Sequence, residues 1–363
     1  MSGLAGLRIG LVGPLPPPAG GMAMQTSQLA ELLRHAKAEV TLVQSNAPYR
    51  PAFVGRVPGA RAFFRLLPYL WALWRAAGRS DLLHVMANSG WSWHLFAAPA
   101  IWIARVRRVP VVINYRGGEA ADFLRRSEGA VRVSMRRAAR LIVPSGFLQQ
   151  VFGAHGMAAE VVPNIVDLQR FHPAAARTTT PPRLLVARNL EAIYDNETAL
   201  RAFARVLQQQ PQARLAVAGT GPLAAQLHEL AASLGIAAQV DFVGRVGRDD
   251  MAALLRASTV AINPSRVDNT PNSVLEALAS GVPVVSTRVG GVPFIVEDGV
   301  TALLVPPQDP AAMAAAVLKL LDDAALAARL AAAGLEQVQR YTWGQVAPRL
   351  TAVYREAMGA ATA

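Results

Sequence analysis

Short apolar runs alternate with longer helical patterns along the first half of the chain. The apolar runs that predict strands lie at residues 7–12, 40–44, 82–86, 109–114, 140–144 and 160–162. Between them apolar positions return at helical spacing, for example over residues 22–33 and 93–106. This alternation predicts a parallel sheet with helices on both faces.

The same rhythm begins again after residues 171–183, a segment rich in Pro, Thr and small residues that is typical of a linker. Strands are expected at 183–187, 214–219, 240–243, 260–263, 283–287 and 302–305. Helices are expected at 197–209, 222–235, 248–257, 271–280, 309–322 and 324–340. The sequence shows no repeat of fixed period, so the pattern predicts two doubly wound α/β domains.

Composition agrees with two folded domains. The 363 residues are 52% hydrophobic and 17% charged, enough apolar material for two cores. Cysteine is absent, which excludes disulfides and thiolate chemistry. No secretory signal is recognisable, and the most apolar stretch, residues 91–104, is shorter than the ~20 residues of a membrane span. We therefore expect a cytoplasmic protein, soluble or bound to a membrane surface.

The positive charge lies in one half of the chain. Of a net charge of +12, residues 1–172 contribute all, with 20 Lys and Arg against 8 Asp and Glu, whereas the remainder holds 16 of each. Such an excess suggests an anionic partner: a membrane surface, lipid phosphate or nucleic acid. A genomic preference for Arg would explain Arg over Lys but not the asymmetry. No nucleic-acid recognition motif accompanies the arginines, so nucleic acid is not expected.

Residues 50–79 form a basic and aromatic stretch without an acidic residue. Helical spacing places four arginines on one face, namely Arg61, Arg65, Arg75 and Arg79. Phe, Leu and Trp fill the remainder, and Pro68 is expected to break the helix. This pattern is typical of an interfacial membrane anchor, with a domain helix that has a narrow solvated edge as the alternative. An anionic membrane, at its cytoplasmic face, is therefore an expected partner.

Two glycine turns between a strand and a helix could approach a phosphate. Gly20 and Gly21 precede one helix, and Gly219 and Gly221 precede another. Glycines at such turns let backbone amides come close to an anion. The loop with Gly20 and Gly21 does not match G-x-G-x-x-G, and no acidic residue ends the second strand, so a dinucleotide site is not expected there. A plain strand–helix connection is the alternative for this loop, and Gly-x-Gly is common at turns such as Gly219–Gly221.

The densest candidate site spans residues 263–283. Thr270 is expected to cap a helix with Pro271 at its first position and Gly281 at its end. The free amides and positive dipole end of this helix suit a phosphate. These amides and the positive end of the dipole are expected beside Ser273.

Two acidic residues accompany that helix. Glu276 lies on the same side as Ser273 and could accept hydrogen bonds from two vicinal hydroxyls, and Asp268 could face the same cavity. A surface helix with ordinary acids is the alternative. The apolar residues 277–279 argue against it.

From residue 161 onward the chain resembles the retaining glycosyltransferases of family 4, which have the GT-B fold. Residues 162–173 are similar to the family's "PNGVD…RF.P" crossover, 217–222 to "V.G.GP" and 242–244 to "F.G". Residues 268–276 occupy its E-x7-E motif and 286–299 its "T..GG..E.....G" motif, and Thr342 and Trp343 resemble the start of its last helix. In the first half the resemblance is looser and rests on Gly20, Gly21 and residues 114–118.

This resemblance implies two facing Rossmann-like domains. Residues 1–172 would bind the acceptor, 173–341 the nucleotide sugar, and 342–363 would form a helix that returns to the first domain.

The resemblance also assigns residues. Glu276 would bind the ribose, Asp268 would lie near the donor sugar, and Arg188 would neutralise the diphosphate. Amides of Gly20 and Gly21, the Gly219 turn, and amides of Asn272, Ser273 and Val274 would surround the phosphates. No cofactor and no metal ion are expected beside the donor substrate.

Three positions depart from the family pattern. The first Glu of E-x7-E is Asp268, and Tyr194 stands where a Lys is usual. The usual His of the first domain is replaced by Arg116 or Tyr115, and Arg116 could supply the missing positive charge.

The expected activity is a retaining, metal-independent transfer of a hexose from a nucleotide sugar to a polysaccharide or lipid-linked glycan. A GT-B nucleotide-sugar epimerase is an alternative, although no acid–base constellation for it is found. A non-catalytic relative that binds nucleotide or glycan is another, suggested by the missing His and Lys. A pyridoxal phosphate enzyme is not expected, because the only lysines are Lys37 and Lys319.

Overall fold

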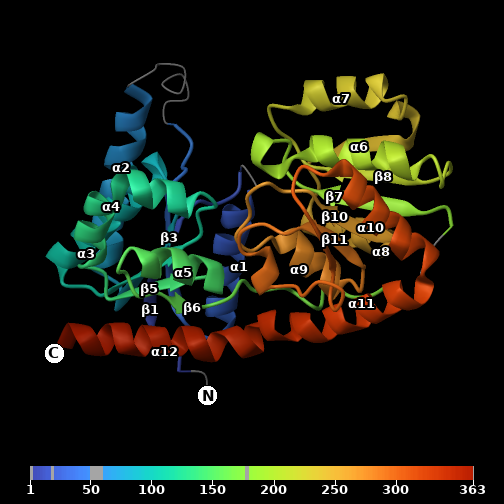
Figure 1. Ribbon diagram of the computed structural model, residues 1–363. Helices are drawn as coiled ribbons and strands as arrows, with labels where there is room; N and C mark the ends of the chain where they lie inside the picture. The colour runs from blue at the N-terminus through green and yellow to red at the C-terminus, as the bar shows by residue number, and fades with distance from the viewer. Residues whose placement is uncertain (1–2, 18–19, 50–59, 176–179, 363) are drawn as a thin grey trace. The chain divides into compact units, whose positions relative to one another are not determined.

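The structure is a computed structural model that describes residues 3–17, 20–49, 60–175 and 180–362, with the backbone alone at 60–63 and 360–362 (Figure 1). The chain forms two compact units. The first unit comprises Met1–Asn164 and Trp343–Ala363, and the second comprises Ile165–Thr342.

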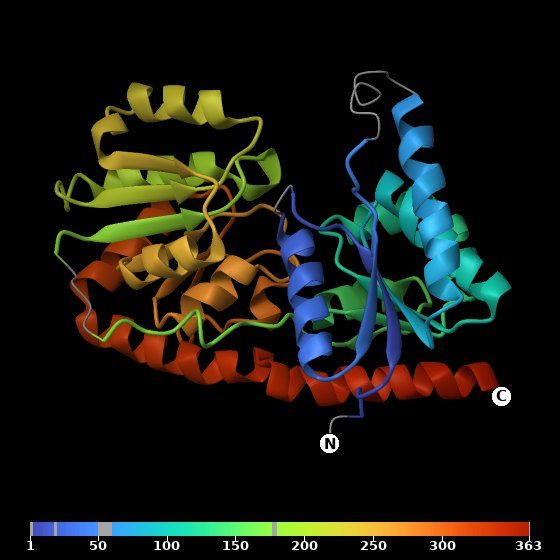
Figure 2. The same ribbon diagram turned by 180° about the vertical axis from the view of Figure 1, so that it is seen from behind.

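The first unit contains a six-stranded parallel sheet in the order β2-β1-β3-β4-β5-β6. Its strands are β1 (Arg8–Gly13), β2 (Glu39–Gln44), β3 (Leu82–Ala87), β4 (Val111–Tyr115), β5 (Arg140–Val143) and β6 (Glu160–Val161). Its helices are α1 (Gly21–His35), α2 (Ala60–Ala77), the π-helical turn η2 (Trp93–Ala97), α3 (Ala98–Arg107), α4 (Ala120–Met135), α5 (Gly146–Ala154) and α12 (Trp343–Thr362). One buried core joins α2, α3, α4 and α5 to one face of this sheet, and α12 packs on β3 and β4 from the other (Figures 1 and 2).

The second unit contains a six-stranded parallel sheet in the order β12-β11-β10-β7-β8-β9. Its strands are β7 (Arg183–Ala187), β8 (Arg214–Ala218), β9 (Val240–Gly244), β10 (Val260–Asn263), β11 (Val284–Thr287) and β12 (Leu303–Val305). Its helices are α6 (Asn196–Val206), α7 (Ala224–Ser233), α8 (Arg248–Arg256), α9 (Asn272–Ala279), α10 (Pro310–Asp322) and α11 (Ala324–Val338). The 3-10 turns are η3 (Ala192–Tyr194), η4 (Ala237–Gln239), η5 (Val292–Phe294) and η6 (Gln339–Tyr341). Helices α6, α7 and α10 share one core, and α8 and α9 belong to another.

The α/β class expected from the sequence is confirmed, and each expected strand is present within two residues of its expected ends. The units divide after Asn164 and not after residue 172. Val166 and Phe171 precede the expected boundary but are buried in a core of the second unit. The residues just before the expected boundary therefore belong to the second unit. The last helix, α12, groups with the first unit.

The expected alignment of four arginines on one helix is wrong. Helix α2 continues through Pro68. Because proline has no N–H, the backbone carbonyl one turn earlier loses its helical donor. Pro68 lies on the exposed side of the helix, where water can donate to that carbonyl instead. Arg79 follows the helix in a turn, and the Arg65 guanidinium lies over the Tyr49 ring, 4.1 Å from its centroid. The Arg61 side chain and residues 50–59 lie outside the described part of the chain.

Within the described ranges, no helix combines the length and the apolar character needed to span a membrane.

Candidate functional site

The strand order of the second sheet reverses between β7 and β10. From β7 the chain proceeds to β8 and β9 on one side, and then returns to β10, β11 and β12 on the other. At such a switch point the loops after the strands separate, and ligands bind there at the carboxyl ends of parallel strands. Arg188 directly follows β7, and Asn263 ends β10.

The Arg188 guanidinium is held on two sides. Its Nε donates to Asn263 Oδ1 at 2.7 Å, and its Nη2 donates to the Asp268 carboxylate. The Tyr194 ring lies against it, 5.0 Å from ring centroid to guanidinium carbon. Burial lowers the pKa of Arg188 to about 10, so it stays a cation at neutral pH. The structure therefore brings Arg188, Asp268 and Tyr194 together, and their roles toward a donor stay predictions.

Asn263 is a positioning residue for which the sequence offered no role. Its Oδ1 also accepts from Ser265 Oγ at 3.0 Å, and its Nδ2 donates to Ser286 Oγ at 2.9 Å. These bonds fix which end of the amide faces Arg188. A polar residue that ends an apolar strand at a switch point is the signal that could have identified it.

Helix α9 begins at Asn272, and its N-cap is Pro271, not Thr270 as expected. The Pro271 carbonyl accepts from the Val274 amide at 3.1 Å, so this amide is already engaged within the first turn. The end of the helix matches the expectation. Gly281 adopts φ +64° and donates to Leu278 O, while Val282 donates to Ala277 O, which together form a Schellman motif.

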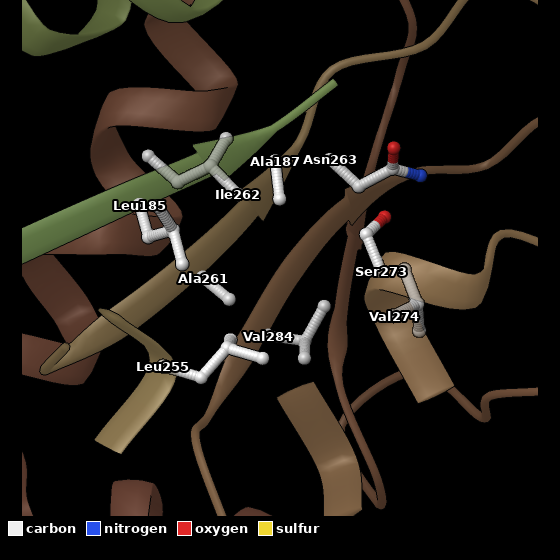
Figure 3. A pocket seen from close by; sticks show the side chains of 9 residues that line it. All are labelled: Leu185, Ala187, Leu255, Ala261, Ile262, Asn263, Ser273, Val274 and Val284. Carbon is white, nitrogen blue, oxygen red and sulfur yellow. The ribbon is translucent and has the colours of Figure 1, made fainter. Parts of the chain in front are cut away.

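The hydroxyl of Ser273 lies in the first turn of α9. Its Oγ is buried and has no hydrogen-bond partner within the described ranges. Figure 3 shows Ser273 beside Asn263 at one end of a pocket whose other lining side chains are apolar. The apolar part belongs to the packing between the sheet, α8 and α9. The polar end is the part that a phosphate oxygen could use.

Glu276 lies one turn further along α9 and is partly buried. Burial raises its pKa to about 7, against the opposing effects of Arg248 and Arg188. Arg248, the first residue of α8, was not identified from the sequence. Because its charge favours the ionised form of Glu276, Arg248 helps to keep a hydrogen-bond acceptor at this position.

Close packing explains why position 219 is a glycine. A β-carbon at this position would clash with the backbone carbonyl of Arg188, and one at Gly221 would clash with that of Leu190. The turn after β8 therefore runs directly against the segment that carries Arg188. A contact of Gly219 with phosphate stays a prediction.

In the first unit, Gly20 is the N-cap of α1, and Gly21 is its first residue. A β-carbon at either glycine would meet no atom within 4 Å among the described residues. There is thus open space beside both glycines at the start of α1, and a contact of their amides with a phosphate stays a prediction. Residues 18 and 19 of this loop lie outside the described part of the chain.

Arg116 directly follows β4, and the alternative at this position, Tyr115, is excluded from the site. Tyr115 is fully buried against Phe152, with ring centroids 4.8 Å apart. The Arg116 guanidinium donates to side-chain amide oxygens, those of Asn114, Gln25 and Asn164. Burial lowers the pKa of Arg116 to about 9, so it too is a cation at neutral pH.

A buried hydrogen-bonded relay continues from Arg116 to the last helix. Asn114 Oδ1 accepts from Arg116 Nε at 3.0 Å, so Asn114 Nδ2 faces His84 Nε2, also at 3.0 Å, and donates to it. His84 Nδ1 then carries the proton and donates to Tyr354 Oη at 2.8 Å. Burial, together with the charge of Arg116, lowers the pKa of His84 to about 3, which keeps it neutral. Helix α12 thereby contributes to the position of Arg116, which sequence reasoning did not anticipate.

Comparison with known proteins identifies the family. A "Glycosyltransferase Family 4" profile matches residues 19–170, and a "Glycosyl transferases group 1" profile matches residues 181–323. The chain is 30% identical to a D-inositol 3-phosphate glycosyltransferase of Streptomyces scabiei over 376 positions, which cover 95% of this chain and 80% of that protein. The chain belongs to the family 4 glycosyltransferases.

Two other relatives match over smaller parts of their length. A glycogen synthase of Mycobacterium tuberculosis is 31% identical over 76% of this chain and 69% of that protein. A D-inositol 3-phosphate glycosyltransferase of Streptomyces avermitilis is 35% identical over 56% of this chain and 48% of that protein.

Solved structures place this family 4 glycosyltransferase in the GT-B fold class. The sucrose-phosphate synthase of Thermosynechococcus elongatus superposes with a TM-score of 0.77 at 23% identity, covering 98% of this chain and all of that one. Anabaena HepE in complex with UDP superposes with a TM-score of 0.73 at 17% identity, covering 95% and 98%. At these identities the likeness concerns the fold.

Across the described ranges, no group of three or more His, Asp or Glu side chains could hold a metal ion. Asp195 begins the sequence Asp-Asn-Glu, which is the nearest match to an Asp-x-Asp metal motif, and its carboxylate accepts from Arg266 at 3.1 Å and from Thr198 at 2.8 Å.

Proposed function

We propose that this glycosyltransferase transfers a hexose from a nucleoside diphosphate sugar to a polysaccharide or lipid-linked glycan, with retention of configuration and without a metal ion. The observation that carries the proposal is the fixed Arg188 guanidinium at the switch point of the second sheet. Departure of the nucleoside diphosphate leaves negative charge on its phosphate. A guanidinium held in place beforehand stabilises that charge with little reorganisation.

The donor site is proposed around α9. The diphosphate would lie at the first turn, where Ser273 offers a buried hydroxyl that lacks a partner in the described structure, and Glu276 would accept hydrogen bonds from the ribose. Anabaena HepE, which shares the fold, has been solved with UDP and with UDP-glucose. A uridine nucleotide is therefore the first ligand to test.

Asp268 and Arg116 have separate roles in this proposal. Asp268 accepts a hydrogen bond from Arg188 and so helps to orient it, and its carboxylate would lie near the donor sugar. Arg116, on the first unit, provides a second cation where family members have a His. At the diphosphate, the charge of Arg188 would take over the role that a metal ion has in other transferases.

Three measurements test the proposal. Melting temperature in the presence of UDP, GDP, ADP and CMP sugars identifies the donor, because a ligand that binds only the folded state raises it. Proton NMR of the product with that donor reports the anomeric configuration, and an inverted product would contradict retention. EDTA should leave the rate unchanged, so strong inhibition would contradict the metal-free mechanism.

A further inference from the structure

The outward side of α2 is apolar. Its exposed residues include Phe64, Leu67, Trp71 and Trp74, with exposed fractions of 45%, 49%, 62% and 43%. Their spacing of three and four residues is that of one helical stripe. The opposite side of the helix, with Tyr69 and Leu73, is buried in the core. A helix that is apolar on both sides buries only one of them in its own domain, so its other side needs a further apolar environment.

The stripe continues onto two neighbouring helices. Helix α3 packs beside α2 and α4 beside α3, over one face of the first sheet (Figures 1 and 2). Trp102 and Val106 of α3 and Val133 of α4 are 41%, 66% and 48% exposed. Trp102 Nε1 donates to Ser134 Oγ at 3.3 Å, which connects α3 to α4. The exposed apolar side chains therefore come from three helices.

Arginines cover the indole rings of this surface. Arg75 lies over Trp71, Arg107 over Trp74 and Arg137 over Trp102, with the guanidinium carbons 4.6, 4.8 and 4.1 Å from the ring centroids. The second of these pairs connects α3 to α2. We call these three pairs, with Leu67, Val106 and Val133, the Trp–Arg surface.

The charge of the three helices is strongly positive. Further exposed arginines are Arg105, Arg108 and Arg136. Helices α2 and α3 contain no acidic residue, and the acids of α4 are already paired, Asp122 with Arg125 and Glu128 with Arg132. The partner of this surface must therefore be anionic and must also accept aromatic and aliphatic side chains.

We propose that the Trp–Arg surface binds the headgroup layer of an anionic lipid membrane. Indole rings favour the boundary between headgroups and acyl chains, while guanidiniums reach lipid phosphates. Val106, Val133 and Leu67 would enter the acyl region, a use that single-stranded nucleic acid, which stacks on aromatic rings, does not offer them. This docking surface lies in the first unit and shares no residue with the proposed donor site of the second unit.

Vesicle flotation of the full chain tests the proposal, with phosphatidylcholine vesicles that do or do not contain phosphatidylglycerol. Wild-type protein should float with the anionic vesicles at low salt and be released as salt rises. The triple variant Arg75→Glu, Arg107→Glu, Arg137→Glu should lose about 100-fold or more in partitioning, at roughly fivefold per basic side chain. Wild-type protein that stays in the aqueous fraction with anionic vesicles would overturn the proposal.

A matched control separates the surface from net charge. Arg205, Arg329 and Arg340 are exposed residues of the second unit, and their change to Glu alters the net charge equally. This control should keep vesicle binding, and an equal loss would contradict a localised surface. The double variant Trp71→Ala, Trp102→Ala should weaken the vesicle binding that survives high salt. Its circular dichroism spectrum and its donor-induced rise in melting temperature should stay as in the wild type. Binding of a single-stranded RNA probe in place of vesicles, lost in the triple variant, would also overturn the proposal.

Discussion

Arg188 and Arg116 both follow a strand of a parallel sheet, but different partners hold them. Arg188 donates to a carboxylate, Asp268, and to the Asn263 amide. The acceptors of Arg116 are side-chain amide oxygens, those of Asn114, Gln25 and Asn164. Burial lowers the pKa of both arginines, and both remain cations at neutral pH.

The comparison shows two ways to position a buried cation. A carboxylate fixes the guanidinium and also reduces the local charge, so an incoming diphosphate at Arg188 needs further donors, which the first turn of α9 can supply. Amide oxygens fix the position of Arg116 without cancelling its charge. We therefore expect substitutions at the two arginines to affect different kinetic constants.

The largest effect is expected from Glu276→Ala. Loss of two hydrogen bonds to a charged acceptor weakens nucleotide binding by about 3–6 kcal/mol, which is a decrease in affinity of roughly 100- to 10,000-fold. Isothermal titration with the donor that the melting-temperature panel selects measures the loss. Arg116→Gln, in the other unit, is the control and should keep the donor affinity. An unchanged affinity in Glu276→Ala would remove Glu276 from the donor site.

Arg188→Ala should lower kcat by about 100- to 1,000-fold, because the charge on the leaving diphosphate grows in the transition state. Donor affinity should fall much less. Steady-state kinetics separates the two constants, and Arg188→Lys, which keeps the charge but loses the two-sided hold, should recover only part of the rate. An effect confined to KM would mean that Arg188 acts only on the bound ground state.

Arg116→Gln should lower kcat by about 10- to 100-fold, the size expected for one charge-assisted hydrogen bond. Donor affinity, measured by titration, should stay as in the wild type. If donor affinity falls as much as it does in Glu276→Ala, the distinction between the two arginines is wrong.

Donor affinity should depend on pH through Glu276, whose pKa burial raises to about 7. Below that pH the carboxyl binds a proton and loses acceptor capacity, so affinity should fall by up to about tenfold per pH unit. Titrations across this range in wild type and Glu276→Gln measure it, and the variant should show weak, pH-independent binding. Parallel pH profiles in the two proteins would contradict the assignment.

The raised pKa of Glu276 makes the stability of the fold depend on pH in the opposite direction from donor affinity. The folded state holds the proton of Glu276 more tightly than the unfolded chain, where the pKa is 4.5, so stability should fall as pH rises between 4.5 and about 7. Glu276→Gln removes this cost, and its melting temperature should exceed that of the wild type above the folded pKa but not below 4.5.

The smallest effect on the rate is expected from Tyr354→Phe. It removes the acceptor of His84 Nδ1, which leaves a buried donor without its partner and costs about 1–3 kcal/mol of stability. Because the relay ends at Arg116, kcat should also fall a few-fold, while donor affinity stays constant. Thermal unfolding and kinetics measure the two effects. A loss of stability with unchanged kcat would show that the relay is structural only.

The sequence predicted well those features that depend on neighbouring residues. Strands and helices were located because apolar residues recur at their own periods, and the end of α9 was located because Gly281 can adopt a left-handed backbone. The beginning of α9 was predicted less well, because Pro271 and Thr270 are both acceptable at a helix start and only the hydrogen bonds decide between them. The E-x7-E spacing predicted the residues of the proposed donor site but not their mutual contacts.

The sequence by itself determined the α/β alternation, the family and the concentration of positive charge in the first half. Only the tertiary structure decided that Asn263 holds Arg188, that Tyr354 reaches His84 across 270 residues, and that Trp71 shares one surface with Trp102. The physical reason is that period and backbone preference act over one or two turns of chain. The partner of a side chain depends instead on which strands and helices the topology brings together, and on the side of each element that the core occupies.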